Sequence, residues 1–123
     1  MPDRQKIVVV EDDPGMRTAL GRLLTAGGYS PVSFGSAEEF LAASPRDRPA
    51  CFVLDIHLGA MSGLDLQRLL RVGGCTVPVI LMTAFDDEAT RATVDALDGS
   101  LLFHKPFNID DLRTAVLFLL RRN

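Results

Sequence analysis

The sequence predicts an α/β fold with one five-stranded, parallel, doubly wound sheet. Short runs rich in Val, Ile, Leu and Phe recur along the chain, and such runs are typical of parallel strands buried on both faces. Stretches with helical periodicity separate these runs. Five alternating strand–helix units imply right-handed crossovers, with helices on both faces of a single sheet. The strands are expected at residues 6–11, 30–34, 51–55, 77–83 and 100–104.

Capping residues mark the starts of the first three helices. Asp13 supplies a capping oxygen before a proline that suits the first helical position. Ser36 with Glu39 predicts a capping box, and Ser62 with Asp65 predicts a weaker one. The helices are expected at residues 14–27, 37–43, 63–72, 87–97 and 109–121.

Glycine pairs and an asparagine mark further helix boundaries. The pairs at 27–28 and 73–74 predict the ends of the first and third helices. Asn108 is expected to begin the last helix, where Phe107 and Leu112 have the spacing of a hydrophobic staple.

Length and composition predict that residues 1–123 form a single globular domain. The 123 residues suffice for a real core, and an apolar fraction of 47% is ordinary for a soluble protein. A net charge of −3 excludes the broad basic field of a nucleic-acid-binding domain. No apolar stretch approaches the ~18 residues that span a bilayer, and the first residues lack a signal-peptide core. We interpret Cys51 and Cys75 as reduced thiols of a cytoplasmic protein.

Five polar residues occur where the predicted strands end. Glu11 and Asp12 come after the first apolar run, Asp55 after the third, Thr83 after the fourth and Lys105 after the fifth. Ligands bind outside the carboxyl ends of the strands in an open parallel sheet, so these side chains should converge at one edge. Carboxylate oxygens suit Mg²⁺, and crowded carboxylates resist ionising unless a cation lies among them. The grouping therefore predicts a site for a divalent cation and a phosphoryl group.

Each of these residues has an ordinary interpretation when it is taken alone. A single Asp at a strand end is usually a cap or loop residue, and the acidic run 11–13 could simply favour the first helical turn. Thr83 alone would be an ordinary strand-end residue, and Lys105 alone a solvated lysine. Their occurrence after four different strands favours the functional interpretation. A metal site built from the two cysteines with His57 and His104 is not predicted, because no two of these residues have a ligand spacing.

Five segments carry a specific resemblance to a known family. In chain order they are Ile7-Val8-Val9-Val10-Glu11-Asp12-Asp13-Pro14, Val53-Leu54-Asp55, Met61-Ser62-Gly63, Leu81-Met82-Thr83-Ala84 and Lys105-Pro106-Phe107. Together they resemble the receiver domain of two-component response regulators, which has a (βα)5 flavodoxin-like fold.

The resemblance implies a phosphorylatable signalling switch that is not an enzyme beyond promoting its own phosphorylation and dephosphorylation. It identifies Asp55 as the phosphoacceptor and has Thr83 and Lys105 bind the phosphoryl oxygens. The implied donor is a sensor histidine kinase, a phosphotransfer protein or a small acyl phosphate. The implied ligands of Mg²⁺ are Glu11, Asp12, Asp55 and the backbone carbonyl of His57.

The resemblance also implies an output surface with two states, formed by the fourth helix, the fifth strand and the fifth helix. Thr83 would move to meet the phosphoryl group and bias this surface. Leu102 stands where the family usually has a switch Tyr or Phe. The same three elements are a candidate homodimer surface. Leu117 and Phe118 lie off the apolar stripe of the last helix, which indicates a partner surface there.

Two other departures lie in the loop after Asp55. Leu58 and Gly59 stand where the family usually has Met-Pro, and glycine leaves the loop more conformational freedom than proline would. His57 occupies a position that faces the phosphoryl group in the family, where the side chain tunes autodephosphorylation.

Three other functions match the sequence less well. An aspartyl-phosphate phosphohydrolase of the haloacid dehalogenase type combines the same residue types, but it carries its nucleophile on the first strand in an Asp-x-Asp pattern. A flavodoxin-like mononucleotide binder has a phosphate loop after the first strand, and this chain has none there. The complete acidic cluster argues against a pseudo-receiver that only binds partners.

The likeness extends to receivers that carry a helix-turn-helix output domain, which suggests transcription regulation without direct nucleic-acid binding by this domain. The sequence does not decide between a stand-alone receiver and a piece of a longer regulator.

Overall fold

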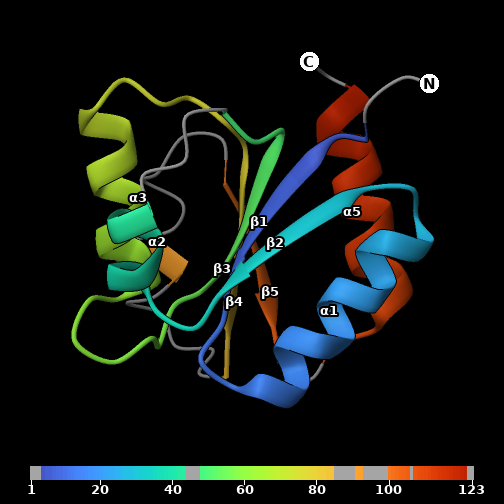
Figure 1. Ribbon diagram of the computed structural model, residues 1–123, viewed down its shortest axis with the longest axis horizontal. Coiled ribbons are helices and arrows are strands. Elements are labelled where there is room, and N and C mark those ends of the chain that lie inside the picture. The colour runs from blue at the N-terminus through green and yellow to red at the C-terminus, as the bar shows by residue number, and fades with distance from the viewer. Residues whose placement is uncertain (1–3, 44–47, 85–90, 93–99, 106, 122–123) are drawn as a thin grey trace.

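Five parallel strands form one sheet in the computed structural model, which describes residues 4–43, 48–84, 91–92, 100–105 and 107–121. The strand order is β2-β1-β3-β4-β5 (Figure 1). The strands are β1 (Lys6–Val10), β2 (Ser30–Phe34), β3 (Cys51–Asp55), β4 (Val79–Thr83) and β5 (Ser100–His104). The helices are α1 (Pro14–Ala26), α2 (Ala37–Ala43), α3 (Gly63–Val72) and α5 (Ile109–Arg121). The predicted doubly wound parallel sheet is confirmed.

Three predicted boundaries differ from the structure by one or two residues. β1 ends at Val10, α1 ends at Ala26, and β4 begins at Val79 rather than at 77. Pro78 has no N–H to donate to a strand ladder, so regular pairing of β4 begins after it. The helix expected at 87–97 lies outside the described residues, apart from 91 and 92, which are helical. Among the described residues, no helix is both long and apolar enough to cross a membrane.

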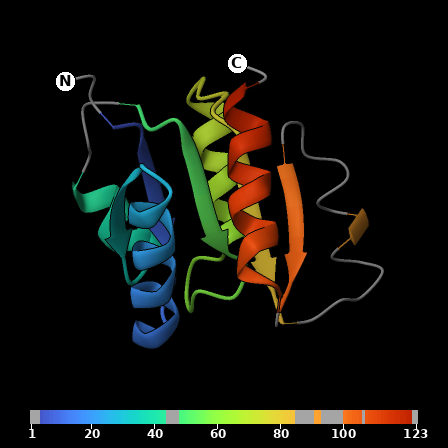
Figure 2. The same ribbon diagram turned by 90° about the vertical axis from the view of Figure 1, so that its right-hand side faces the viewer.

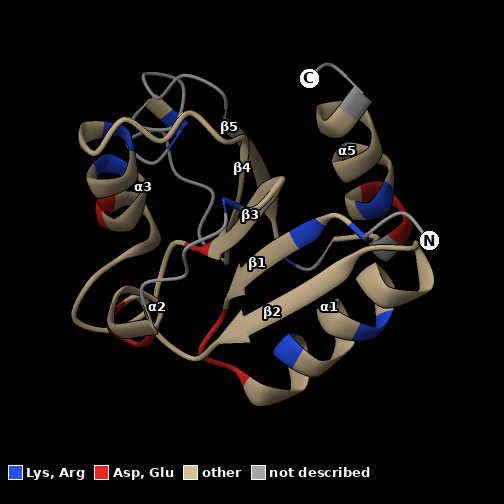
Figure 3. Cartoon of the chain, turned by 45° about the horizontal axis from the view of Figure 1, so that its top comes forward, with Lys and Arg blue, Asp and Glu red and all other residues tan. Residues whose placement is uncertain are grey.

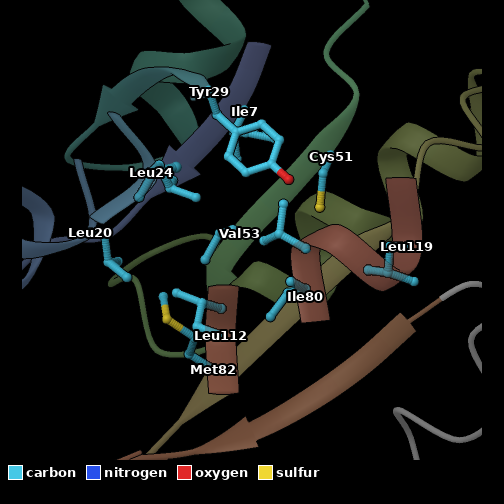
Figure 4. Packing of buried hydrophobic residues seen from close by; sticks show 12 residues of the cluster. Ile7, Leu20, Leu24, Tyr29, Cys51, Val53, Ile80, Met82, Leu112 and Leu119 are labelled. Carbon is cyan, nitrogen blue, oxygen red and sulfur yellow. The ribbon is translucent and has the colours of Figure 1, made fainter. Parts of the chain in front are cut away.

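Helices cover both faces of the sheet (Figure 2). Successive strand residues point to opposite faces, so β1, β3, β4 and β5 each contribute residues to two hydrophobic clusters. Ile7 of β1 joins Leu20 of α1 and Leu112 of α5 in one cluster (Figure 4). Its neighbour Val8 joins the opposite cluster with Leu66 of α3. This packing on two faces explains why β1, β3 and β4 are almost entirely apolar in sequence.

The predicted helix starts are largely confirmed. The Asp13 carboxylate accepts a hydrogen bond from the Gly15 N–H at 3.1 Å, and the Ser62–Asp65 capping box is complete. The box predicted at α2 is only half correct. The Ser36 hydroxyl accepts from the Glu39 N–H at 3.0 Å, but the Glu39 carboxylate accepts from the Gly35 N–H. The turn before α2 places the amide of residue 35, rather than that of the cap, within reach of this carboxylate.

The other helix boundaries follow the predicted residues. The Asn108 side chain accepts from the Asp110 N–H at 2.8 Å and begins α5. Phe107 packs against the cluster that contains Leu112, as the staple requires. The glycine pairs follow α1 and α3, and Gly28 and Gly74 have φ angles of +93° and +87°. These left-handed conformations allow the chain to reverse direction after each helix.

The strand register brings the carboxyl ends of the strands to one edge of the sheet. Val10 of β1 pairs with Leu54 of β3, and Thr83 of β4 pairs with His104 of β5. Residues that end or follow these strands therefore lie close together in space, although they are up to 94 positions apart in sequence.

Candidate active site

The acidic residues predicted for the site meet at the carboxyl edge of the sheet. Glu11 directly follows β1 and is fully buried, Asp55 ends β3 and is 5% exposed, and Asp12 is exposed. One carboxylate oxygen from each lies within 4.8 Å of the other two. Figure 3 shows acidic segments after β1 and at the end of β3. Three oxygens at this spacing, one of them open to solvent, suit a hard divalent cation that retains water and phosphate ligands.

Lys105 connects the two buried carboxylates. Its Nζ donates to Glu11 Oε1 at 2.7 Å and to Asp55 Oδ2 at 3.1 Å. Its backbone N–H donates to the Thr83 carbonyl at 2.6 Å, so the segment after β5 is tied to the end of β4. The ammonium group is thereby held at the acidic cluster from the end of β5, although β4 separates β5 from β3 in the sheet.

The cluster combines three carboxylates with the ammonium group of Lys105, and its electrostatics reflect this excess of acidic groups. Burial raises the pKa of Glu11 to about 7, Asp55 adds to the rise, and the hydrogen bond from Lys105 opposes it. For Lys105, burial works to lower the pKa, but the hydrogen bonds to Glu11 and Asp55 outweigh it and leave the pKa raised. The lysine therefore stays charged, whereas Glu11 retains a proton up to near neutral pH. A bound cation would favour the ionised carboxylates.

The two oxygens of Asp55 contact different donors. The His57 backbone N–H donates to Oδ1 at 3.1 Å, while Oδ2 receives the Lys105 ammonium. These two contacts together fix the plane of the Asp55 carboxylate at the carboxyl edge of the sheet. Charge-assisted hydrogen bonds of this kind are stronger than neutral ones.

Thr83 lies at the same edge, fully buried at the end of β4. Its Oγ1 is 3.3 Å from Nε2 of His57, on the loop after β3. The sequence predicted the position of Thr83, a backbone role for His57 and a His57 side chain that faces the phosphoryl group, but it did not predict this contact between the two side chains.

Two further residues that shape the site were missed. Arg17 of α1 donates from Nη1 to the Glu11 carbonyl at 2.8 Å, which holds the loop that carries the acidic pair. Gly63 begins α3 so close to β3 that an added Cβ would collide with the Asp55 carbonyl. Its N–H donates to the Ile56 carbonyl at 2.9 Å. The Met-Ser-Gly motif signalled Gly63, whereas no spacing in the sequence signalled Arg17.

Gly59 and Leu102, two positions at which the sequence departs from the receiver pattern, both lie in the part of the chain that the structure describes. Gly59 has a φ of +93°, which proline with its fixed φ near −65° cannot adopt. Leu102 on β5 is half-buried and packs against the cluster on the α2–α3 face. The loop after Asp55 therefore follows a path that proline at 59 would prevent.

Comparison with known proteins gives one consistent family. A family model described as the response regulator receiver domain matches residues 7–117. Nodulation protein W of Bradyrhizobium diazoefficiens is 37% identical over 119 residues, which are 95% of this chain and 52% of that protein. Response regulator MprA of Mycobacterium leprae is 36% identical over 118 residues, 95% of this chain and 51% of that protein. The chain thus spans about half the length of these curated relatives.

Solved structures agree with these matches. The BeF3-activated DrrB receiver domain has a TM-score of 0.86 at 26% identity, over 98% of this chain and 100% of that one. The receiver domain of the Francisella response regulator 1452 has a TM-score of 0.84 at 24% identity, over 97% and 98% of the two chains, and shares the fold. No comparison supports a phosphohydrolase. The chain belongs to the response regulator receiver domain family, whose members are phosphorylatable signalling switches.

Proposed function

We propose that Asp55 accepts a phosphoryl group from a histidine kinase, a phosphotransfer protein or a small acyl phosphate in a reaction that requires Mg²⁺. The observation that supports this most is the contact set of its carboxylate. One oxygen is held by the His57 N–H and the other by Lys105, beside two further acidic groups. The carboxylate is thus oriented and its charge partly balanced before any donor arrives.

In the proposed reaction an Asp55 oxygen attacks phosphorus in line, and the bond from phosphorus to the donor atom breaks. The product is an acyl phosphate on Asp55. Lys105 would pass from the carboxylates to a phosphoryl oxygen, and the Thr83 hydroxyl would donate to another. Glu11, Asp12, Asp55 and the His57 backbone carbonyl would hold Mg²⁺, which supplies positive charge to the transferring oxygens.

We further propose that residues 1–123 act as one switch unit and that the chain is not an enzyme for other substrates. Leu117 and Phe118 on α5 are 42% and 52% exposed, which favours this face as the surface for a homodimer or another partner. We propose no direct nucleic-acid contact and no membrane contact by this unit. Free thiols such as those of Cys51 and Cys75 persist in the cytoplasm, which is the location we propose.

The test is modification by acetyl phosphate with Mg²⁺, followed by intact mass measurement. Wild type should gain the mass of one phosphoryl group, and Asp55→Asn should gain none. Asp13→Asn is the matched control, because it removes a neighbouring acid but retains a capping side chain. It should be modified like wild type. If Asp55→Asn is modified as fully as wild type, the acceptor assignment is wrong.

A further inference from the structure

The contact between His57 and Thr83 joins the loop after β3 to the end of β4, at the sheet edge that carries Asp55. His57 Nε2 and Thr83 Oγ1 are 3.3 Å apart. A hydroxyl both donates and accepts, so the hydrogen bond forms with either tautomer of a neutral imidazole. Thr83 is fully buried, whereas His57 is exposed on its loop. The buried threonine hydroxyl is therefore in contact with a side chain that is itself exposed.

The backbone of Thr83 has little freedom to move. Its carbonyl accepts from the Lys105 N–H at 2.6 Å, and β4 lies between β3 and β5 in the sheet. A change of partner for the hydroxyl is therefore mainly a rotation about χ1, between the few staggered positions open to a β-branched side chain. Such a rotation carries Oγ1 away from the His57 ring.

His57 also contacts the proposed acceptor. Its backbone N–H donates to Asp55 Oδ1 at 3.1 Å. The same residue thus binds Asp55 through its main chain and Thr83 through its side chain. The ring can leave Thr83 while the main-chain contact to Asp55 persists.

We propose that the His57 ring is a latch that holds the Thr83 hydroxyl in the resting state and is displaced when a phosphoryl group forms on Asp55. This inference rests on the proposed role of Thr83 as a phosphoryl ligand. The latch opposes activation by the strength of one hydrogen bond. Removing it should strengthen the binding of a phosphoryl mimic by about two- to tenfold, the range of a net hydrogen bond.

The experiment is a double-mutant cycle read out as the dissociation constant of beryllofluoride in the presence of Mg²⁺. Isothermal titration at one pH is carried out on wild type, His57→Ala, Thr83→Ala and the double mutant. His57→Ala should bind beryllofluoride more tightly than wild type. The same substitution in the Thr83→Ala background should have no effect, because the hydroxyl that the ring holds is gone.

Two further variants isolate the latch from general effects. His57→Leu retains much of the side-chain volume without a ring nitrogen, and it should behave like His57→Ala. His104→Ala is the matched control, because His104 pairs with Thr83 in the strand register and is exposed. It should bind beryllofluoride as wild type does.

Weaker or unchanged binding by His57→Ala overturns the latch, since the ring would then assist the phosphoryl group or act on nothing. Equal tightening with and without the Thr83 hydroxyl also overturns it. In either case the proposed function stands if wild type binds beryllofluoride and Asp55→Asn does not. If wild type binds none, the proposed function fails, and the latch fails with it.

Discussion

Glu11 is a carboxyl residue whose pKa lies well above its usual value. It is fully buried after β1, and burial raises its pKa to about 7. The unfolded chain releases this proton near the usual pKa of 4.5, whereas the folded protein still holds it. The contribution of this group to stability is therefore full below pH 4.5 and is lost as the pH rises to about 7.

The same pKa predicts how Mg²⁺ binding depends on pH. Below about pH 7 the metal must displace the Glu11 proton, so the dissociation constant should fall by up to about tenfold per pH unit as the pH rises. Above that pH it should level off. Isothermal titration with Mg²⁺ at several pH values measures this dependence. Glu11→Gln should bind more weakly and lose the slope, and a slope that persists in this variant would contradict the assignment to Glu11.

Gly59 is a second residue at which the backbone conformation limits which substitutions are tolerated. Its φ of +93° is costly for any residue with a Cβ, although the space around it is open. Gly59→Ala should therefore lower the free energy of unfolding by about 1–2 kcal/mol in a urea titration.

Gly21 provides the control for this substitution. It lies inside α1, and an added Cβ there also meets nothing within 4 Å. Since alanine is the better helix former, Gly21→Ala should raise the free energy of unfolding by up to ~1 kcal/mol. Equal effects of the two substitutions would show that the loop at 59 is free to adopt another path.

At the scale of elements, the prediction concerns β5 and α5. Leu102 is half-buried where the family usually has a large flat side chain. Because leucine is smaller than an aromatic residue, its inward and outward positions differ less in buried apolar area. Each Å² of that difference contributes about 25 cal/mol. We therefore predict weak coupling between phosphorylation and the α5 face through this residue, with dimerisation depending more on neighbours such as Phe118.

Dimer dissociation constants with and without beryllofluoride test this, by analytical ultracentrifugation of wild type and Leu102→Tyr. The activation-dependent shift should be small in wild type. A shift of several hundredfold in wild type that the tyrosine abolishes would show that leucine is the working switch, contrary to this prediction.

At the scale of the whole molecule, we expect metal binding and folding to be linked through the edge of the sheet. The proposed metal ligands follow or end β1 and β3, so they come together only when the sheet is formed. At about 100 times its dissociation constant, Mg²⁺ should raise the free energy of unfolding by about 2.7 kcal/mol. Asp12→Asn should lose most of this gain in the free energy of unfolding, because it removes the charge of one of the three clustered carboxylates. Asp12 is exposed, so the substitution itself should disturb packing little.

Thermal or urea unfolding with and without Mg²⁺ measures this gain. Asp13→Asn should retain it, since Asp13 caps α1 and is not in the metal cluster among the described residues. Equal gains in both variants would argue that the metal binds elsewhere.

The sequence by itself determined the order of the described elements, most of their ends and the five polar residues of the site. These follow from local signals: apolar runs, helical periodicity, capping residues and motifs such as Leu81-Met82-Thr83-Ala84. Because the carboxyl ends of parallel strands share one edge, the convergence of Asp55 and Lys105 also followed from the fold class.

Only the tertiary structure decided several contacts between segments that are far apart in sequence, and the conformation of one loop residue. Three features depend on how separate segments pack in the folded chain. They are the His57–Thr83 hydrogen bond, the hydrogen bond from Arg17 to the Glu11 carbonyl and the left-handed conformation of Gly59. The capping box at α2 was half wrong for the same reason, since a single turn decides which amide Glu39 reaches. The raised pKa of Glu11 likewise depends on burial, which is a property of the assembled sheet and not of the residues around position 11.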